Sequence, residues 1–290
     1  MRLFSYQDQA KQQRVGLLRG VDSPDFIDLA ASDASLPKSL LGILETTGAM
    51  DRVAQLVSDG KAVIGQIKDV TFLPVIDRPN KIVCLGLNYA DHAAEGGHAT
   101  PEYPSFFMRG ASSLVGHNQP MIRPKVSEKF DYEAELAFVI GKKAKHLTAD
   151  NALDCVAGYA AFNDGSLRDY QRKTSQWTIG KNFDATGAFG PWLVTPDELP
   201  KGASGLRIQS RLNGQIMQDA NTKLFLCDVV HTLVLLSEVM TLEPGGVVIT
   251  GTPGGVGHAR KPPVWMKAGD LIEIEIEGVG LLSNRIADEI

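Results

Sequence analysis

The feature that most constrains this chain is a predicted strand over residues 132–141 that begins with two acids and continues as an apolar run. A strand directs residues i and i+2 to the same face, so Glu133 and Glu135 point the same way, with Cα atoms about 7 Å apart. Two carboxylates on one face repel each other unless a cation neutralises them, and Mg²⁺, Mn²⁺ and Ca²⁺ prefer oxygen ligands. The alternative is a solvated strand edge that carries two acids and binds no ion.

A third acid favours the metal site over the solvated edge. Asp164 follows the apolar run 157–162, where a second predicted strand emerges from the core. Three protein oxygens leave about three positions open on an octahedral ion, and the carboxylate and 2-oxo oxygens of a 2-oxo acid can fill two of them. We therefore predict that Glu133, Glu135 and Asp164 bind Mg²⁺, with Mn²⁺ or Ca²⁺ as alternatives, and that the ion holds an enolate.

The rest of the chain predicts an α+β fold that is rich in strands. Short or alternating apolar runs bounded by turn residues indicate strands, and the dipeptide Asn213-Gly214 indicates a hairpin. After residue 80 we expect strands at 81–86, 132–141, 157–162, 206–212, 246–250 and 271–277, and a helix near 227–240. Strands and helices do not alternate regularly, which argues against a doubly wound parallel sheet.

A proline-rich connector at residues 72–80 divides the sequence into two regions. We expect a small N-terminal α/β domain over residues 1–75 and a catalytic domain over residues 76–290. The first region shows two short strand patterns, at 14–19 and 25–29, and two stretches with helical spacing, at 39–44 and 50–57.

Composition and absent motifs argue against several classes of function. The formal net charge of −5 is unlike that of a nucleic-acid-binding surface, and the three cysteines are spaced for neither a disulfide framework nor a zinc site. No apolar stretch is long enough to span a membrane, and the N-terminus lacks the apolar region of a secretory signal, so we expect a cytoplasmic protein. The dinucleotide, phosphate-loop, serine-hydrolase and zinc-protease motifs are missing.

Six motifs, in order along the chain, resemble those of the fumarylacetoacetate hydrolase family from about Lys81 to the C-terminus. They lie at residues 86–95, 131–135, 163–171, 180–184, 213–214 and 250–257. Residues 260–270 and the N-terminal region are similar to the branch of the family that contains the mammalian domain-containing-protein-2 relatives. The resemblance implies a mixed β-roll of packed sheets with the site in its mouth, usually in a homodimer.

The resemblance also implies roles for individual residues. It places the metal on the same acidic trio and makes Lys181 the cation that holds substrate oxygens and the oxyanion. His92 and Glu95 match a catalytic dyad on a mobile lid, here residues 91–104. Two polar residues match substrate-contacting positions, and an arginine matches a substrate-binding or supporting position: Gln171, Thr252 and Arg168.

The residues themselves support these roles less strongly than the resemblance does. His92 and Glu95 share a face if they lie on a helix, and a carboxylate beside an imidazole suits a base that activates water, but the residues alone favour an exposed pair. Lys181 alone resembles a surface lysine, and the other histidines have no motif partner. Two positions depart from the family: Arg109 replaces a common lysine and is expected near the distal end of the substrate, and Gly165 replaces a larger residue and is expected to loosen the pocket wall.

Together these observations predict hydrolysis of a carbon–carbon bond in a 2,4-diketo acid of the acylpyruvate type. His92 and Glu95 would deprotonate a water, and the ion and Lys181 would stabilise the pyruvate enolate that leaves. The alternative is an oxaloacetate tautomerase, or an isomerase or decarboxylase of a 2-oxo diacid, because these reactions share an enolate. A non-catalytic binding module is a third class. The expected partner is a small 2-oxo acid, with no nucleic acid and no membrane.

Overall fold

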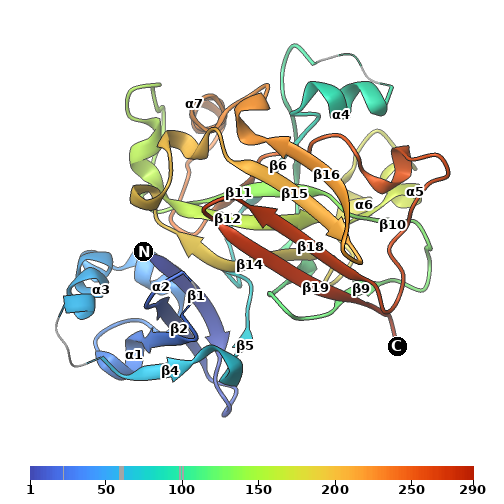
Figure 1. Cartoon of the computed structure of the whole chain (residues 1–290). Coiled ribbons are helices and arrows are strands. Elements are labelled where there is room, and N and C mark those ends of the chain that lie inside the picture. The colour runs from blue at the N-terminus through green and yellow to red at the C-terminus, as the bar shows by residue number, and fades with distance from the viewer. Residues whose placement is uncertain (22, 59–61, 98, 100) are drawn as a thin grey trace.

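The computed structural model confirms a strand-rich α+β fold in which two large sheets pack against each other (Figure 1). It describes residues 1–21, 23–58, 62–97, 99 and 101–290. The larger sheet has the strand order β4-β3-β2-β1-β14-β12-β11-β17-β6-β7, and the smaller one has the order β16-β15-β18-β19-β9. None of the described helices is both long and apolar enough to cross a membrane.

The N-terminal residues form one end of the larger sheet. β1 pairs antiparallel with β14, with Leu3 opposite Leu193. The elements of this end are β1 (Arg2–Gln7), β2 (Gln13–Leu18), β3 (Asp25–Asp28), α1 (Leu29–Ser32), α2 (Leu40–Glu45), α3 (Ala49–Ser58), β4 (Ile64–Gln66) and β5 (Thr71–Phe72). Residues on both sides of the expected boundary near residue 75 therefore share one sheet, and the division into two domains stays a prediction.

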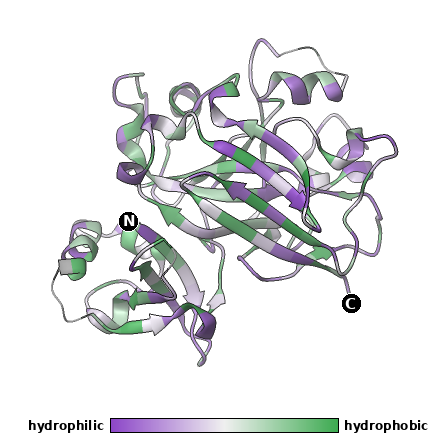
Figure 2. Ribbon diagram, viewed as in Figure 1, coloured by the Kyte–Doolittle hydropathy of each residue, from purple (hydrophilic) through white to green (hydrophobic). Residues whose placement is uncertain are grey.

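The centre of the larger sheet explains why its sequence is continuously apolar. β11 is buried along its whole length: Leu136 and Phe138 pack toward the smaller sheet, whereas Ala137 and Val139 pack toward the N-terminal elements. Strands buried on both faces show no polar alternation, and Figure 2 shows hydrophobic residues concentrated in the packed sheets. This part of the sheet comprises β6 (Ile82–Gly86), β7 (Ser105–Met108), β8 (Leu114–Val115), β11 (Ala134–Ile140), β12 (Val156–Asp164), β14 (Gly187–Val194) and β17 (Val247–Ile249).

The smaller sheet is built on the predicted hairpin. Asn213 and Gly214 both have positive φ, 52° and 81°, and join β15 to β16 as a two-residue loop. β18 alternates buried and more exposed residues, as a half-solvated strand does. The strands are β9 (Met121–Arg123), β15 (Arg207–Leu212), β16 (Gln215–Asn221), β18 (Leu271–Ile276) and β19 (Gly280–Asp288).

Short elements complete the end of the roll where the acidic residues lie. β10 (Phe130–Asp131) pairs with β13 (Ser166–Leu167), and the helices are α4 (Ala90–Glu95), α5 (Arg168–Gln171), α6 (Thr178–Lys181) and α7 (Val229–Val239). The predicted helix near 227–240 is α7, and it begins where the Asp228 side chain accepts a hydrogen bond from the His231 N–H. β11 starts at Ala134, two residues later than its pattern predicts.

Candidate metal centre

The three acids singled out by the sequence lie together at the ends of two neighbouring strands. Glu133 precedes β11 and Asp164 ends β12, and the Asp164 N–H donates a hydrogen bond to the Glu133 carbonyl at 3.0 Å. One carboxylate oxygen from each of Glu133, Glu135 and Asp164 lies within 4.8 Å of the others, and all three residues are buried. The antiparallel pairing of β11 with β12 brings together residues that are about thirty positions apart.

Two of these carboxylates have buried cations as partners. Lys181 Nζ donates to Glu133 Oε2 and to Asp164 Oδ2, each at 2.5 Å, and Arg168 Nη2 lies 2.7 Å from Glu133 Oε1. Burial alone would raise the pKa of Glu133, but Arg168 and Lys181 outweigh burial and hold that pKa below its ordinary value. Burial would likewise lower the pKa of Lys181, but Asp164 and Glu133 raise it. Lys181 is therefore a charged ammonium at the site and not the surface lysine of the alternative reading.

Glu135 differs from the other two acids because no cation of the described chain contacts it. Its Oε2 accepts a hydrogen bond from the backbone N–H of Gly251 at 2.5 Å. Burial, together with the charges of Asp164 and Glu133, raises the pKa of Glu135 well above its ordinary value. A divalent ion among the three carboxylates would supply the missing positive charge, and an all-oxygen donor set suits a hard cation. The residues present therefore fit such an ion.

The predicted dyad is assembled on α4. His92 Nδ1 lies 2.9 Å from Glu95 Oε1, and Glu95 Oε2 accepts a hydrogen bond from the Gly255 N–H at 2.8 Å. The pair thus shares a helical face, as its spacing predicts, and Gly255 connects it to the loop after β17. Its catalytic role and the mobility of the lid over residues 91–104 stay predictions, and residues 98 and 100 of that lid lie outside the described residues.

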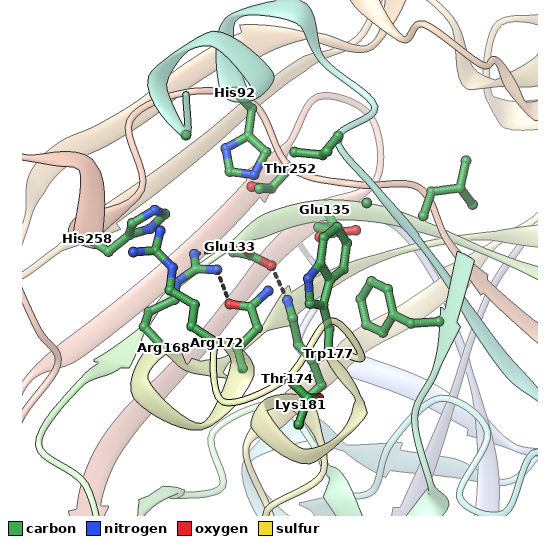
Figure 3. Close-up of a pocket in the computed structure, with 16 residues that line it drawn as sticks. His92, Glu133, Glu135, Arg168, Arg172, Thr174, Trp177, Lys181, Thr252 and His258 are labelled. Atoms are coloured by element: carbon green, nitrogen blue, oxygen red, sulfur yellow. Dashed lines mark hydrogen bonds and ion pairs between the residues drawn. The ribbon is translucent and has the colours of Figure 1, made fainter. Parts of the chain in front are cut away.

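A cavity of about 410 Å³ opens over the carboxylates (Figure 3). Asp164 is fully buried and Glu95 contacts His92 Nδ1, and neither of these acids lines the cavity. Seven of the residues assigned from the sequence line the cavity: His92, Glu133, Glu135, Arg168, Gln171, Lys181 and Thr252. The fold therefore gathers candidate residues from five separate motifs around one cavity.

The polar residues predicted to contact substrate are partly engaged by the protein. Thr252 Oγ1 donates to the Ala134 carbonyl at 3.0 Å and accepts from Gln218 Nε2 at 2.8 Å. Gln171 lines the cavity, and its Oε1 accepts from Arg168 Nη1 at 2.9 Å, whereas no described residue bonds its amide nitrogen. Substrate contact by both residues stays a prediction.

Arg168 supports the site from one side of the cavity. Its Nε donates to Asp131 Oδ2 at 2.7 Å while Nη2 pairs with Glu133, so the guanidinium joins two buried carboxylates. Burial would lower the pKa of Arg168, but Glu133 and Asp131 raise it. This placement is compatible with either predicted role of Arg168, substrate binding or support of the site. Arg168 lines the cavity and also pairs with Glu133.

The two departures from the family have other consequences than those predicted. Arg109 does not line the cavity: it is buried, and its Nη1 contacts Asp164 Oδ1 at 2.5 Å. Gly165 does not loosen the pocket wall either, since a Cβ there would lie 2.1 Å from the Thr186 carbonyl oxygen. Arg109 therefore holds a carboxylate of the site, and Gly165 permits close packing behind it.

Among the other lining residues, His258 was misjudged from the sequence, and Trp177 and Arg172 were missed. His258, expected to be structural or exposed, lines the cavity with Nδ1 3.3 Å from Asp131 Oδ2. Trp177 packs edge-on against Phe107 and so closely over Gly86 that a Cβ on that glycine would lie 2.0 Å from the indole. Gly86 at the end of an apolar run was the available signal, because glycine in a strand permits such an approach. No sequence motif identifies Arg172 as a residue of the site.

A family model, a curated relative and a solved structure all relate this chain to the same family. Residues 81–287 match the family model described as "Fumarylacetoacetate (FAA) hydrolase C-terminal". The chain is 40% identical over 289 residues to the Xenopus laevis protein named "Oxaloacetate tautomerase fahd2, mitochondrial", covering 99% of this chain and 90% of that protein. A fumarylacetoacetate hydrolase structure from Exiguobacterium antarcticum has a TM-score of 0.84 at 34% identity, with 100% of each chain covered.

A second solved structure bears on the metal. A maleylpyruvate hydrolase from Sphingobium sp. SYK-6, in complex with manganese(II) and pyruvate, has a TM-score of 0.82 at 25% identity, with 100% of each chain covered. Together the two structures confirm the predicted β-roll of packed sheets.

Proposed function

This chain belongs to the fumarylacetoacetate hydrolase family, and from that premise we propose that it is a metal-dependent oxaloacetate tautomerase. The observation that carries the proposal is the buried cluster of Glu133, Glu135, Asp164 and Lys181 at one cavity, which suits a small molecule that develops negative charge on oxygen. The near-full-length similarity to a protein named as a tautomerase of oxaloacetate supports the choice of substrate.

The acidic trio would hold the ion, for which we propose Mg²⁺, with Mn²⁺ or Ca²⁺ as substitutes, because the ligands are all carboxylate oxygens. When bound, the ion supplies a Lewis acid for the 2-oxo oxygen. Lys181 has three N–H donors and uses two of them on Glu133 and Asp164, so one is left for an enolate oxygen of the substrate.

The chain also offers a group that can move the proton. Glu95 engages Nδ1 of His92, and this leaves Nε2 as the ring atom that can exchange a proton with the substrate. In the keto-to-enol direction His92 takes a proton from C3 of oxaloacetate, the 2-oxo oxygen gains a proton from water, and His92 then returns its proton to water. In the opposite direction the enol oxygen loses its proton to water, and His92, protonated by water, delivers a proton to C3.

The proposal is tested by following the absorbance decay of enol-oxaloacetate with and without the protein and Mg²⁺. We expect the metal-loaded protein to accelerate the decay beyond Mg²⁺ alone, and Glu135→Ala to abolish the acceleration. A decay that is the same with and without protein contradicts the proposed activity. Full turnover by Glu135→Ala shows instead that the metal assignment is wrong.

Hydrolysis of an acylpyruvate, the reaction predicted first from the sequence, is the second candidate. It is favoured by the His92–Glu95 pair, which could activate a water, and by the similarity to a maleylpyruvate hydrolase. Incubation with acetylpyruvate and Mg²⁺ would show loss of the diketone absorbance. No loss across a panel of acylpyruvates excludes this candidate and leaves tautomerisation in place.

The assembly and location are separate proposals. We propose a homodimer, which sedimentation velocity of the full chain tests directly. The expected cytoplasmic location also stays a prediction, since the name of the Xenopus laevis relative includes the word mitochondrial. Imaging of the tagged chain in its own cells tests the location.

A further inference from the structure

One cation that lines the cavity has no partner among the described residues. Arg168 is bound by Asp131 and Glu133, and Lys181 is bound by Glu133 and Asp164. Arg172 also lines the cavity, yet no described residue forms an ion pair or a hydrogen bond with its guanidinium. An arginine has five N–H donors in a planar fork. This one therefore presents its donors to the cavity or to solvent.

The position of Arg172 gives the cavity two chemically different regions. Arg172 follows directly after α5, and Figure 3 shows Arg168, Arg172 and His258 gathered on one side of the pocket, with Trp177 and Lys181 on the other. His258 and Arg168 both contact the buried Asp131 carboxylate, so Arg172 is the cation on this side whose donors have no partner among the described residues. The cavity thus combines a carboxylate cluster suited to a cation with a basic corner suited to an anion.

We propose that Arg172 binds the second carboxylate of a 2-oxo dicarboxylate and makes the site select diacids over monoacids. This inference rests on the proposed function, because the trio's ion would engage the carboxylate and 2-oxo oxygens at the other end of the substrate. An arginine fork matches both oxygens of a carboxylate. A cavity of about 410 Å³ has room for a four-carbon diacid between the two regions.

The chain supplies a matched control in the next residue. Lys173 carries the same charge as Arg172, but its Nζ lies 3.5 Å from the ring centroid of Tyr170, and Lys173 does not line the cavity. Removing either charge changes the net charge of the protein equally. An effect of Arg172→Gln that Lys173→Gln lacks is therefore a contact effect and not a general effect of the electrostatic field.

The test uses two ligands that differ by one carboxylate. Malate and lactate share the same 2-hydroxy carboxylate, and malate carries a second carboxylate on the adjacent carbon, whereas oxalate probes the metal end alone. Calorimetric titration of the Mn²⁺-loaded full chain gives the dissociation constants without requiring turnover. We expect the wild type to bind malate more tightly than lactate, and Arg172→Gln to weaken malate binding about ten- to a hundredfold.

In that variant, lactate and oxalate binding should be nearly unchanged. Lys173→Gln should leave all three affinities as they are, and Arg172→Lys should recover part of the malate affinity. Equal binding of malate and lactate by the wild type overturns the inference, as does a malate preference that survives in Arg172→Gln. An equal loss of affinity for all three ligands in Arg172→Gln also overturns it. Arg172 would then affect binding near the metal site and not binding of the second carboxylate.

The inference and the proposed function can fail separately. If the wild type does not turn over oxaloacetate but its malate preference depends on Arg172, the tautomerase proposal falls and the diacid site stands. If the wild type is active and the KM for oxaloacetate is unchanged in Arg172→Gln, the diacid site falls and the tautomerase proposal stands.

Discussion

Arg109 holds Asp164 from behind the cavity, with Nη1 2.5 Å from Oδ1, while Lys181 contacts the other oxygen of the same carboxylate. The Arg109 side chain also donates to Thr186 Oγ1, to the Gly165 carbonyl and to Ser113 Oγ. Asp164 is therefore fixed by two cations, and its orientation toward the trio depends on a residue that does not line the cavity.

Replacing Arg109 by Met should destabilise the protein strongly. The variant leaves the Asp164 carboxylate with one cation instead of two and removes three other hydrogen bonds, and loss of one partner from a buried ion pair costs about 3–5 kcal/mol. Urea unfolding measures the loss. As a control, Arg207→Met removes a cation whose ion pair with Asp219 is solvent-exposed, and it should cost no more than about 1 kcal/mol. Equal losses in the two variants would contradict the supporting role of Arg109.

Replacing Glu135 by Gln should have opposite effects with and without metal. In the metal-free protein the substitution removes a buried carboxylate that no described cation contacts, so the free energy of unfolding should rise by about 1–3 kcal/mol. With Mn²⁺ the variant loses a ligand, so its metal affinity and its metal-dependent stabilisation should fall. Thermal unfolding with and without Mn²⁺ measures both. Glu128→Gln, at an exposed position, should change neither.

The stability difference between Glu135→Gln and the wild type, measured without metal, should change with pH in a definite direction. The folded-state pKa of Glu135 is raised above its ordinary value of 4.5, so the folded protein favours the protonated carboxyl. The stability that this proton contributes is present below the unfolded-state pKa and is lost as the pH rises through the folded-state pKa. The gain from Glu135→Gln should therefore be small near pH 4 and larger at neutral pH in metal-free protein. A gain that shrinks as the pH rises contradicts the raised pKa.

The sequence predicts those parts of the fold that leave a local pattern, such as a fully buried strand or a tight turn. β11, β12 and β17 were predicted because strands buried on both faces leave continuous apolar runs, and the β15–β16 hairpin was predicted because Asn-Gly suits positive φ. The sheet that continues from β1 to β14 was not predicted, because strand order depends on contacts between distant residues such as Leu3 and Leu193.

The site residues that could be predicted are those whose position depends on local strand geometry. Glu133 and Glu135 are two residues apart, so strand geometry alone placed them on one face, and Asp164 was found at a strand end. Arg172 and Trp177 were missed because they lie in a polar loop whose position over the cavity is set by packing, not by a local pattern. Arg109 was misplaced because its sequence position says nothing about whether its side chain points into the cavity or behind it.

Replacing His92 by Ala should separate chemistry from metal binding. His92 lines the cavity, but its Nδ1 faces Glu95 and it is not one of the three clustered acids, so the variant should bind Mn²⁺ nearly as well as the wild type. Turnover should fall about 10²- to 10⁴-fold, as expected when a positioned acid–base group is removed. Glu95→Gln should show a smaller loss, because the imidazole remains and only the carboxylate beside its Nδ1 is removed. His231→Ala, which changes an exposed histidine on α7, is the matched control.

Two results for His92→Ala would contradict the roles assigned here, and they point to different errors. A large loss of Mn²⁺ affinity would show that His92 is itself a ligand, so that the ion lies closer to α4 than the three carboxylates imply. Unchanged turnover with intact metal binding would show that the proton moves by another route, and Lys181 and His258, which also line the cavity, would then be candidates. Turnover and affinity measured on the same preparation distinguish the two.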